Sequence, residues 1–126
     1  MWYDDINKPF DALVGQTLVA VDGMEKGSDS VTFTTASGTQ YGMYHTQDCC
    51  ESVTLVDVVG DVADLLDTPI VVAREDHNAD HDDGESYESS TWTFYTLRTI
   101  KGTVTLRWLG QSNGYYSERV DFVEIA

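Results

Sequence analysis

The chain has 126 residues, of which 41% are hydrophobic and 11% aromatic, and this length is typical of one domain. The ordinary apolar fraction excludes wholesale disorder. Its 22 acidic and 7 basic residues give a net charge of −15, which argues against direct binding to nucleic acid or an anionic membrane. No run approaches the roughly 20 apolar residues of a membrane helix, and the first ten residues lack the pattern of a secretory signal. We therefore expect a small cytoplasmic protein.

The first predicted element is a short helix over residues 9–14, because Pro9 stands at its start and Gly15 directly after its end. The next elements are strands. Polar and apolar residues alternate over 30–35 and again over 52–56, which is typical of strands with one buried face.

A second short helix is predicted over residues 61–66, with Asp61 as its N-cap and Pro69 preventing its continuation. Strands follow it over residues 70–73, 91–97, 103–109 and 119–125. Turn signals separate the runs at Asp22-Gly23, Ser37-Gly38, Lys101-Gly102 and Asn113-Gly114. The sequence therefore predicts a mainly β protein: one antiparallel barrel or sandwich of seven or eight short strands, in a single domain over 1–126.

The segment 75–90 is compositionally unusual, since it holds seven acidic residues, two histidines and no aliphatic residue larger than alanine. Such a segment cannot bury a face, so a solvated and mobile loop is expected. Oxygen ligands for calcium would come from Asp76, Asn78, Asp80, Asp82, Asp83 and Glu85, but Gly84 is misplaced for a helix–loop–helix calcium site. A self-repelling charge run is the favoured interpretation.

The charge is unevenly distributed along the chain. Residues 1–97 contain three basic and nineteen acidic residues, whereas residues 98–126 contain four basic and three acidic ones. The second region, with the strand before it, is also rich in aromatic residues. Arginine beside Trp and Tyr suits a flat anionic ligand, which pairs with guanidinium and stacks on a ring; cross-strand ion pairs and core packing are the alternative. The candidates are Arg98, Arg107, Trp108, Tyr115 and Tyr116.

Two polar segments complete the predicted ligand-binding surface. The segment 109–118 carries more amide, hydroxyl and phenol groups than closing a turn requires, and Asn113 and Glu118 belong to it. The other half is expected from the segment 44–51. Its candidate ligand-binding residues are Tyr44, His45, Gln47, Asp48 and Glu51.

The two cysteines, Cys49 and Cys50, are adjacent, and reduced thiols are the simpler expectation in a reducing cytosol. A zinc site could use His45 and Cys49 with a third ligand from Cys50, His77 or His81, but the paired spacing of structural zinc sites is missing. His45 could also activate Cys49 or Cys50 as a nucleophile, although the spacing of the residues indicates no third group that would orient the histidine. No cofactor is therefore predicted, and the protein is expected to be more a binding module than an enzyme.

Three segments resemble a known family: MYHTQDCCESV (Met43–Val53), TWTFYTLRTIKGTVTLRWLG (Thr91–Gly110) and SNGYYSERVDF (Ser112–Phe122). The family is small, uncharacterised, encoded mainly by bacteriophages, many of which infect actinobacteria, and known only as a domain of unknown function. The resemblance runs from about Phe10 to Ile125 and implies a phage accessory protein in the cytoplasm of an infected bacterium. It transfers no catalytic residues.

Three functions are compatible with these patterns. The leading hypothesis is a non-enzymatic module that captures a small anionic, nucleotide-like ligand or a host protein. The second is an acidic decoy that mimics DNA and blocks a host nucleic-acid-binding protein. The third is a small enzyme that uses His45 with one of the cysteines. An exposed strand edge could also pair between subunits and give a homo-oligomer.

Overall fold

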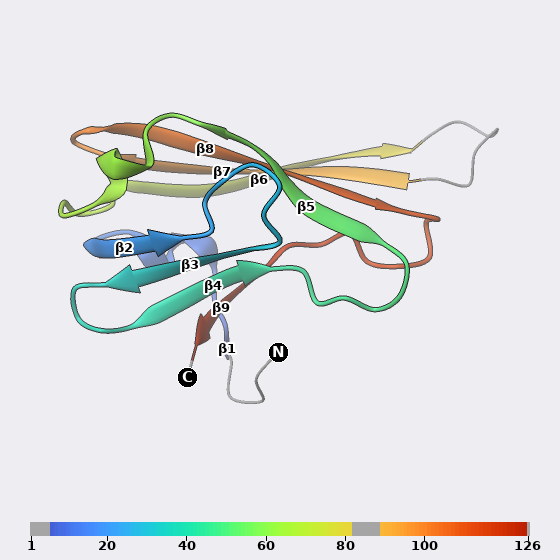
Figure 1. The fold of residues 1–126 in the computed structure, drawn as a ribbon, viewed down its shortest axis with the longest axis horizontal. Coiled ribbons are helices and arrows are strands. Elements are labelled where there is room, and N and C mark those ends of the chain that lie inside the picture. The colour runs from blue at the N-terminus through green and yellow to red at the C-terminus, as the bar shows by residue number, and fades with distance from the viewer. Residues whose placement is uncertain (1–5, 82–88, 126) are drawn as a thin grey trace.

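The computed structural model describes residues 6–81 and 89–125. Nine strands and two 3₁₀ helices follow one another along this part of the chain (Figure 1). The helices are η1 (Phe10–Leu13) and η2 (Val62–Leu65). The strands are β1 (Ile6–Asn7), β2 (Leu18–Asp22), β3 (Ser30–Thr35), β4 (Gln40–Tyr44), β5 (Ser52–Val59), β6 (Val72–His81), β7 (Ser89–Thr99), β8 (Gly102–Ser112) and β9 (Asp121–Ile125).

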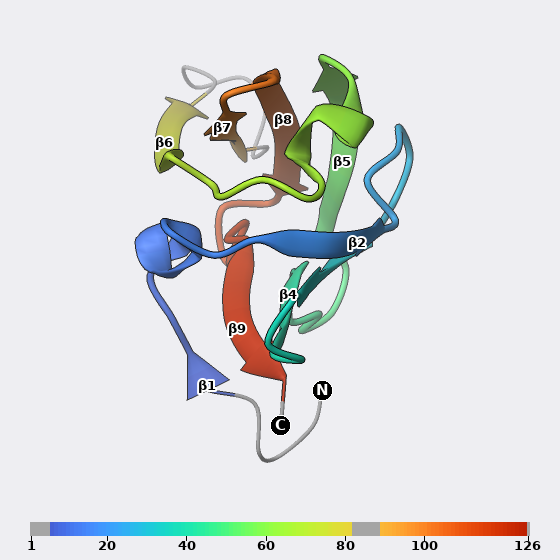
Figure 2. The same cartoon turned by 90° about the vertical axis from the view of Figure 1, so that its left-hand side faces the viewer.

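The strands form two antiparallel sheets that pack as a sandwich. One sheet has five strands in the order β1-β9-β4-β3-β2, and the other has four in the order β5-β8-β7-β6. Figure 2 views the layers end-on, with β6, β7, β8 and β5 above β1, β9 and β4. The prediction of a mainly β fold is confirmed, and the architecture is a sandwich. The chain passes between the sheets after β4 and again after β8.

Alternation of side chains explains which face of each strand is buried. In β3, Val31, Phe33 and Thr35 are buried while their neighbours are exposed or partly exposed, as the predicted strand over 30–35 requires. In β7 the buried residues are Thr93, Tyr95, Leu97 and Thr99, and in β8 they are Val104, Leu106, Trp108, Gly110 and Ser112.

Aromatic rings join the two layers. The ring of Phe10 in η1 lies 4.6 Å from that of Tyr95 in the four-stranded sheet and 5.2 Å from that of Phe122 in the five-stranded sheet. Trp108 is fully buried, and its indole Nε1 donates to the Sδ of Met43 across the core at 3.2 Å. The short N-terminal helix therefore fills the space between the sheets.

Two predictions about the elements need correction. The structure has nine strands instead of seven or eight. The segment 75–90 is not wholly a loop, because β6 and β7 pair from Val72↔Arg98 to His81↔Ser89, while Asp82, Asp83, Gly84 and Glu85 lie outside the described residues. Backbone pairing with β7 holds the polar residues 75–78 in a strand, although they bury no continuous apolar face.

Both predicted helices exist as single 3₁₀ turns of four residues. The Asp61 side chain caps η2 by accepting from the Ala63 N–H at 3.0 Å, as predicted. Neither of these helices, nor any other helix in the described ranges, is long and apolar enough to cross a membrane.

Candidate ligand-binding surfaces

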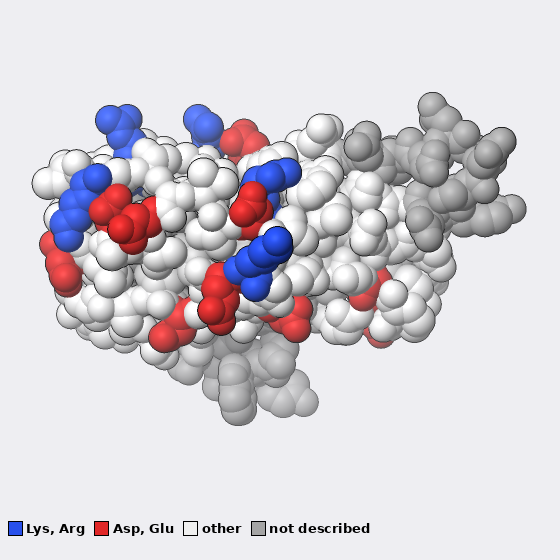
Figure 3. All heavy atoms as spheres, turned by 45° about the horizontal axis from the view of Figure 1, so that its top comes forward, with Lys and Arg blue, Asp and Glu red and all other residues white. Residues whose placement is uncertain are grey.

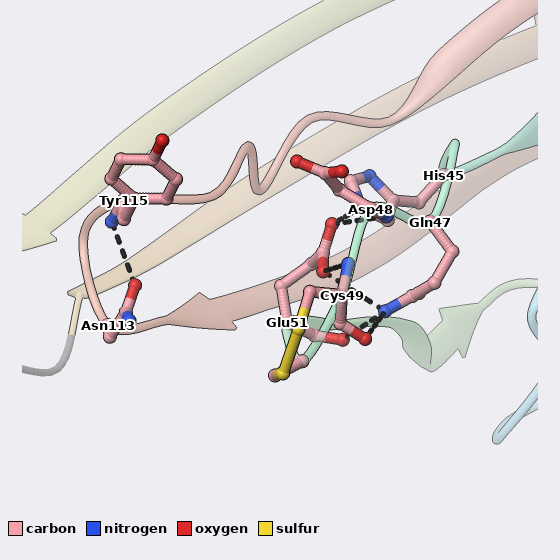
Figure 4. Close-up of a disulfide and its surroundings, with 8 residues drawn as sticks. His45, Gln47, Asp48, Cys49, Glu51, Asn113 and Tyr115 are labelled. Atoms are coloured by element: carbon pink, nitrogen blue, oxygen red, sulfur yellow. Dashed lines mark hydrogen bonds and ion pairs between the residues drawn. A yellow bond between two sulfur atoms is a disulfide. The ribbon is translucent and has the colours of Figure 1, made fainter.

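The segment between β4 and β5 folds around the carboxylate of Glu51. Its Oε1 accepts from the backbone N–H of Cys49 at 2.8 Å, and its Oε2 accepts from that of Asp48 at 2.9 Å. The Gln47 side-chain amide donates to Oε1 at 3.1 Å and to the Glu51 carbonyl at 2.7 Å. Figure 4 shows these bonds converging on Glu51. The predicted site residues of this segment therefore meet, but around a carboxylate of the chain itself.

His45 connects this segment to the chain that enters β9. Its Nε2 lies 2.8 Å from Glu51 Oε2, and its Nδ1 lies 2.6 Å from the carbonyl oxygen of Arg119. Both ring nitrogens of His45 therefore have oxygen partners within the chain. The side chains of His45 and Glu51 are 4% and 0% exposed. This buried, hydrogen-bonded pair ties the two crossings between the sheets.

The hydrogen bonds outweigh the cost of burying the Glu51 charge. Burial opposes ionisation, but the bonds from His45 and from the backbone of Cys49 and Asp48 lower the pKa of Glu51 to about 2. The carboxylate is therefore ionised at neutral pH with its acceptors occupied. A hollow of about 370 Å³, lined in part by His45, Gln47 and Glu51, lies beside it, and the ring of Tyr44 is partly exposed at the end of β4.

The expectation of reduced thiols is wrong, since Cys49 and Cys50 form a disulfide between adjacent residues. These residues lie at a bend rather than within a strand, so their side chains need not point to opposite faces. Neither ring nitrogen of His45 bonds to a cysteine sulfur in the structure. Among residues 6–81 and 89–125, no group of three or more His, Cys, Asp or Glu side chains is placed to hold a metal ion.

The second predicted segment, after β8, forms a separate turn. Gly114 has a φ of 90°, and the Asn113 side chain accepts from the Tyr115 N–H at 2.9 Å (Figure 4). Tyr115 is 82% exposed and contacts Tyr116 edge-on at 5.0 Å. This turn does not close a hairpin, because β8 and β9 belong to different sheets.

Glu118 is an anchor of that crossing rather than an exposed ligand contact. It is 9% exposed, and its Oε1 accepts from the Thr91 hydroxyl at 2.7 Å while its Oε2 accepts from the Ser112 hydroxyl. A Cβ at Gly110 would lie 2.6 Å from the Glu118 carbonyl oxygen. The absent side chain of Gly110 therefore lets the crossing segment pack directly on β8.

The structure separates Arg107 from Trp108, which were predicted to act together. Successive residues of β8 point to opposite faces, so Trp108 is fully buried in the core while Arg107 faces outward. Arg107 instead meets Trp92, whose ring centroid lies 5.1 Å from its guanidinium carbon. Trp108 is therefore a core residue, and the aromatic ring beside Arg107 is that of Trp92.

The outer face of the four-stranded sheet carries a partly exposed cluster of aromatic and arginine side chains. Trp92 and Phe94 project from β7 with ring centroids 6.3 Å apart and planes 15° from parallel. Arg107, opposite Phe94 in the ladder, also pairs with Asp57 of β5 at 3.2 Å. We call Trp92, Phe94 and Arg107 the outer-face cluster. Arg98 is exposed on the same face, further along β7.

Figure 3 looks obliquely onto this side of the molecule. Several arginine and lysine side chains there lie against acidic ones, in agreement with the Arg107–Asp57 and Arg74–Asp76 ion pairs. Trp92 and Phe94 were not among the candidate residues predicted from the sequence. Their membership of the outer-face cluster follows from strand parity: the buried residues Thr93, Tyr95 and Leu97 leave the even-numbered positions outside.

Comparisons with known proteins identify the family without assigning an activity. A model of a family described as a domain of unknown function (DUF7448) matches residues 11–122. No match was found among curated proteins or among solved structures. The matched range includes both crossings, the outer-face cluster and all strands except β1 and the C-terminal part of β9. The chain therefore belongs to the DUF7448 family.

Proposed function

We propose that this protein is a non-enzymatic phage accessory protein of the infected bacterial cytoplasm, which holds a small, flat, anionic ligand of the nucleotide type. The outer-face cluster would be its binding surface. The observation that carries the proposal is the guanidinium of Arg107 placed 5.1 Å over the ring of Trp92 on a partly exposed sheet face.

The two aromatic rings supply the stacking part of this surface. Trp92 and Phe94 stand nearly parallel on neighbouring outward positions of β7, so they extend one apolar area along the strand. A planar ring gains about 1–3 kcal/mol by stacking on an aromatic side chain. Leu109, opposite Trp92 in the ladder, is partly exposed beside them.

Arg107 supplies the positive charge of this surface, and its guanidinium has a fixed orientation. Its Nη1 pairs with Asp57 at 3.2 Å, and both side chains are about 40% exposed (41% and 42%). The guanidinium is thus oriented by the protein while part of it stays open to an incoming phosphate or carboxylate. Arg98 lies on the same face of a molecule whose net charge is −15, so this face offers an anion a second cation that most of the chain lacks.

The test is calorimetric titration with adenosine 5′-monophosphate, with adenosine and inorganic phosphate as partial ligands. The variants Arg107→Gln and Trp92→Leu should each weaken binding at least about tenfold, since a charge-assisted hydrogen bond or a stacked ring is lost.

Arg74→Gln is the matched control. It removes an outward arginine that also pairs with an aspartate but, among the described residues, does not lie over an aromatic ring as Arg107 does. It should therefore bind the nucleotide as the parent does. A flat titration with the parent protein, or equal losses in Arg107→Gln and Arg74→Gln, would contradict the proposal.

A further inference from the structure

A groove on the inner side of the four-stranded sheet lies apart from the outer-face cluster. It has a volume of about 400 Å³ and is lined by β6, β7 and residues 117–120 of the crossing to β9, a size within the range of small-molecule sites. Glu75 and Glu118 both line it, together with Thr93. Because β6 is the last strand of its sheet, the groove opens at an edge of the sandwich.

The two carboxylates in the groove are held by neutral hydroxyl groups. The buried Tyr95 hydroxyl donates to Glu75 Oε1 at 2.7 Å, and the Thr91 hydroxyl donates to Glu118 Oε1 at 2.7 Å. Burial, together with the adjacent Glu75 carboxylate, raises the pKa of Tyr95, so its hydroxyl remains a donor. Within the described residues, neither Glu75 nor Glu118 forms a salt bridge.

Thr93 adds an independent observation. It is only 4% exposed and lines the groove. Among the described residues its hydroxyl forms no hydrogen bond, and it is not a fully enclosed atom, since the enclosed side-chain atom without a partner there is Thr68 Oγ1. The Thr93 hydroxyl is therefore open to the groove that it lines. A hydroxyl of this kind accepts from a ligand that brings N–H donors.

The basic side chain beside the groove is already directed elsewhere. Arg119 lines the groove, but its side chain is 76% exposed and its Nε lies 3.6 Å from Asp121 Oδ1. His77 lines the groove from β6 and is exposed. With Arg119 offset by Asp121, the two glutamates are the anionic groups that line the groove, while Lys8 lies in the adjoining hollow that Glu75 and Arg119 also line. The net charge of −15 adds to the attraction for cations.

We infer that this groove binds an organic cation with several N–H donors, an alkylammonium or a guanidinium group, between the carboxylate of Glu75 and the hydroxyl of Thr93. The carboxylates are placed in advance by Tyr95 and Thr91, so the ligand supplies the missing positive charge and the missing donor. This site is independent of the nucleotide proposal, since it uses the opposite face of the sheet.

The experiment is an amide chemical-shift titration with butylammonium and butylguanidinium at about 150 mM salt, which screens non-specific attraction to the acidic surface. Saturable shifts are expected in β6, β7 and residues 117–120, with half-saturation in the millimolar range, roughly −4 kcal/mol. Tetramethylammonium carries the same charge without N–H donors and should bind at least about tenfold more weakly.

Matched variants distinguish binding in the groove from non-specific attraction to the acidic surface. Glu75→Gln keeps an acceptor for Tyr95 and should weaken binding about tenfold or more. Asp76→Asn removes the same charge from the next residue, whose side chain lies on the opposite face of β6, and should leave the shifts unchanged. Thr93→Val should also weaken binding, whereas Thr105→Val on the outer face should not; thermal unfolding of all four variants checks that they fold.

An equal loss of affinity for the organic cation in Glu75→Gln and Asp76→Asn would overturn the inference. Chemical shifts that do not saturate, or tetramethylammonium that binds as tightly as butylammonium, would also overturn it. Spermidine and a capped tripeptide with a central arginine then distinguish the two sources of such a cation. Preferential binding of the first assigns the groove to a free polyamine. Preferential binding of the second assigns it to a basic side chain of a protein partner.

Discussion

The Glu51 carboxylate is an anion bound by other groups of the same chain. Two backbone N–H groups, the Gln47 amide and the His45 ring surround its carboxylate, an arrangement that in another protein would hold a phosphate or sulfate. Because the side chain is fully buried, the cluster fixes the loop after β4 and leaves this anion site occupied. Glu51, which the sequence analysis predicted as a ligand contact, therefore binds groups of the chain itself.

The protonation of Glu51 should appear in the pH dependence of stability. Its pKa is about 2 in the folded protein and 4.5 ordinarily, so its stabilisation is complete above about pH 4.5 and is lost as the pH falls towards 2. Urea unfolding of the parent and of Glu51→Gln between pH 2 and 6 measures this. The difference in unfolding free energy between the two should shrink on acidification; Glu25→Gln, an exposed control, should not reproduce the trend.

Residue types alone could not reveal which polar side chains serve the fold. His45, Gln47, Asp48 and Glu51 were grouped correctly from the sequence, but their mutual hydrogen bonds depend on how the loop bends. Trp108 was assigned to the surface because it neighbours Arg107, although neighbours in a strand face opposite ways. Parity applied consistently would have selected Trp92, as the exposed partner of Arg107, from the sequence itself.

At the scale of elements, the crossing from β8 to β9 depends on close backbone approach. Glu118 packs over Gly110, and its carboxylate is held by hydroxyls of Thr91 and Ser112. The crossing therefore carries residues 117–120 alongside β7, where they form one wall of the groove.

Gly110→Ala should destabilise this crossing. The added methyl would lie 2.6 Å from the Glu118 carbonyl oxygen and 2.7 Å from its Cβ, so backbone must move, at a cost of about 1–3 kcal/mol. Chemical denaturation measures the loss. Gly42→Ala is the control, because its nearest atom is the flexible end of Ile125 at 3.2 Å; an equal or larger loss there would contradict the role given to Gly110.

The strands differ in how well their pattern predicts them. β3 agrees with the predicted range at both ends because each residue alternates between core and solvent. β6 extends from Val72 to His81, far beyond the predicted 70–73, because pairing with β7 rather than burial defines it. A strand held mainly by its neighbour leaves little hydrophobic pattern in its own sequence.

At the scale of the whole molecule, charge opposes compactness. The net charge of −15 is confined to a folded chain of 14.0 kDa, and mutual repulsion favours the expanded unfolded state. The buried His45–Glu51 pair is shielded from solvent, whereas the Arg74–Asp76 pair is more than half exposed and contributes little.

Salt should therefore stabilise the protein. Raising sodium chloride from about 10 mM to about 300 mM shortens the screening length several-fold, and relief of repulsion worth about 1 kcal/mol would raise the Tm by about 4 °C for a chain of this size. Differential scanning calorimetry measures the shift. A falling Tm would mean that the surface ion pairs, such as Arg107–Asp57, outweigh the repulsion.

The position of β9 has a consequence for synthesis on the ribosome. This strand lies between β1 and β4 and pairs with both, so the five-stranded sheet stays split until residues 121–125 have left the exit tunnel. The four-stranded sheet needs nothing beyond Ser112 for its own ladders and can form earlier. During synthesis the four-stranded sheet would thus be complete while the five-stranded sheet still lacks β9. A translation product that ends before Asp121 would leave the edges of β1 and β4 unpaired and prone to aggregation.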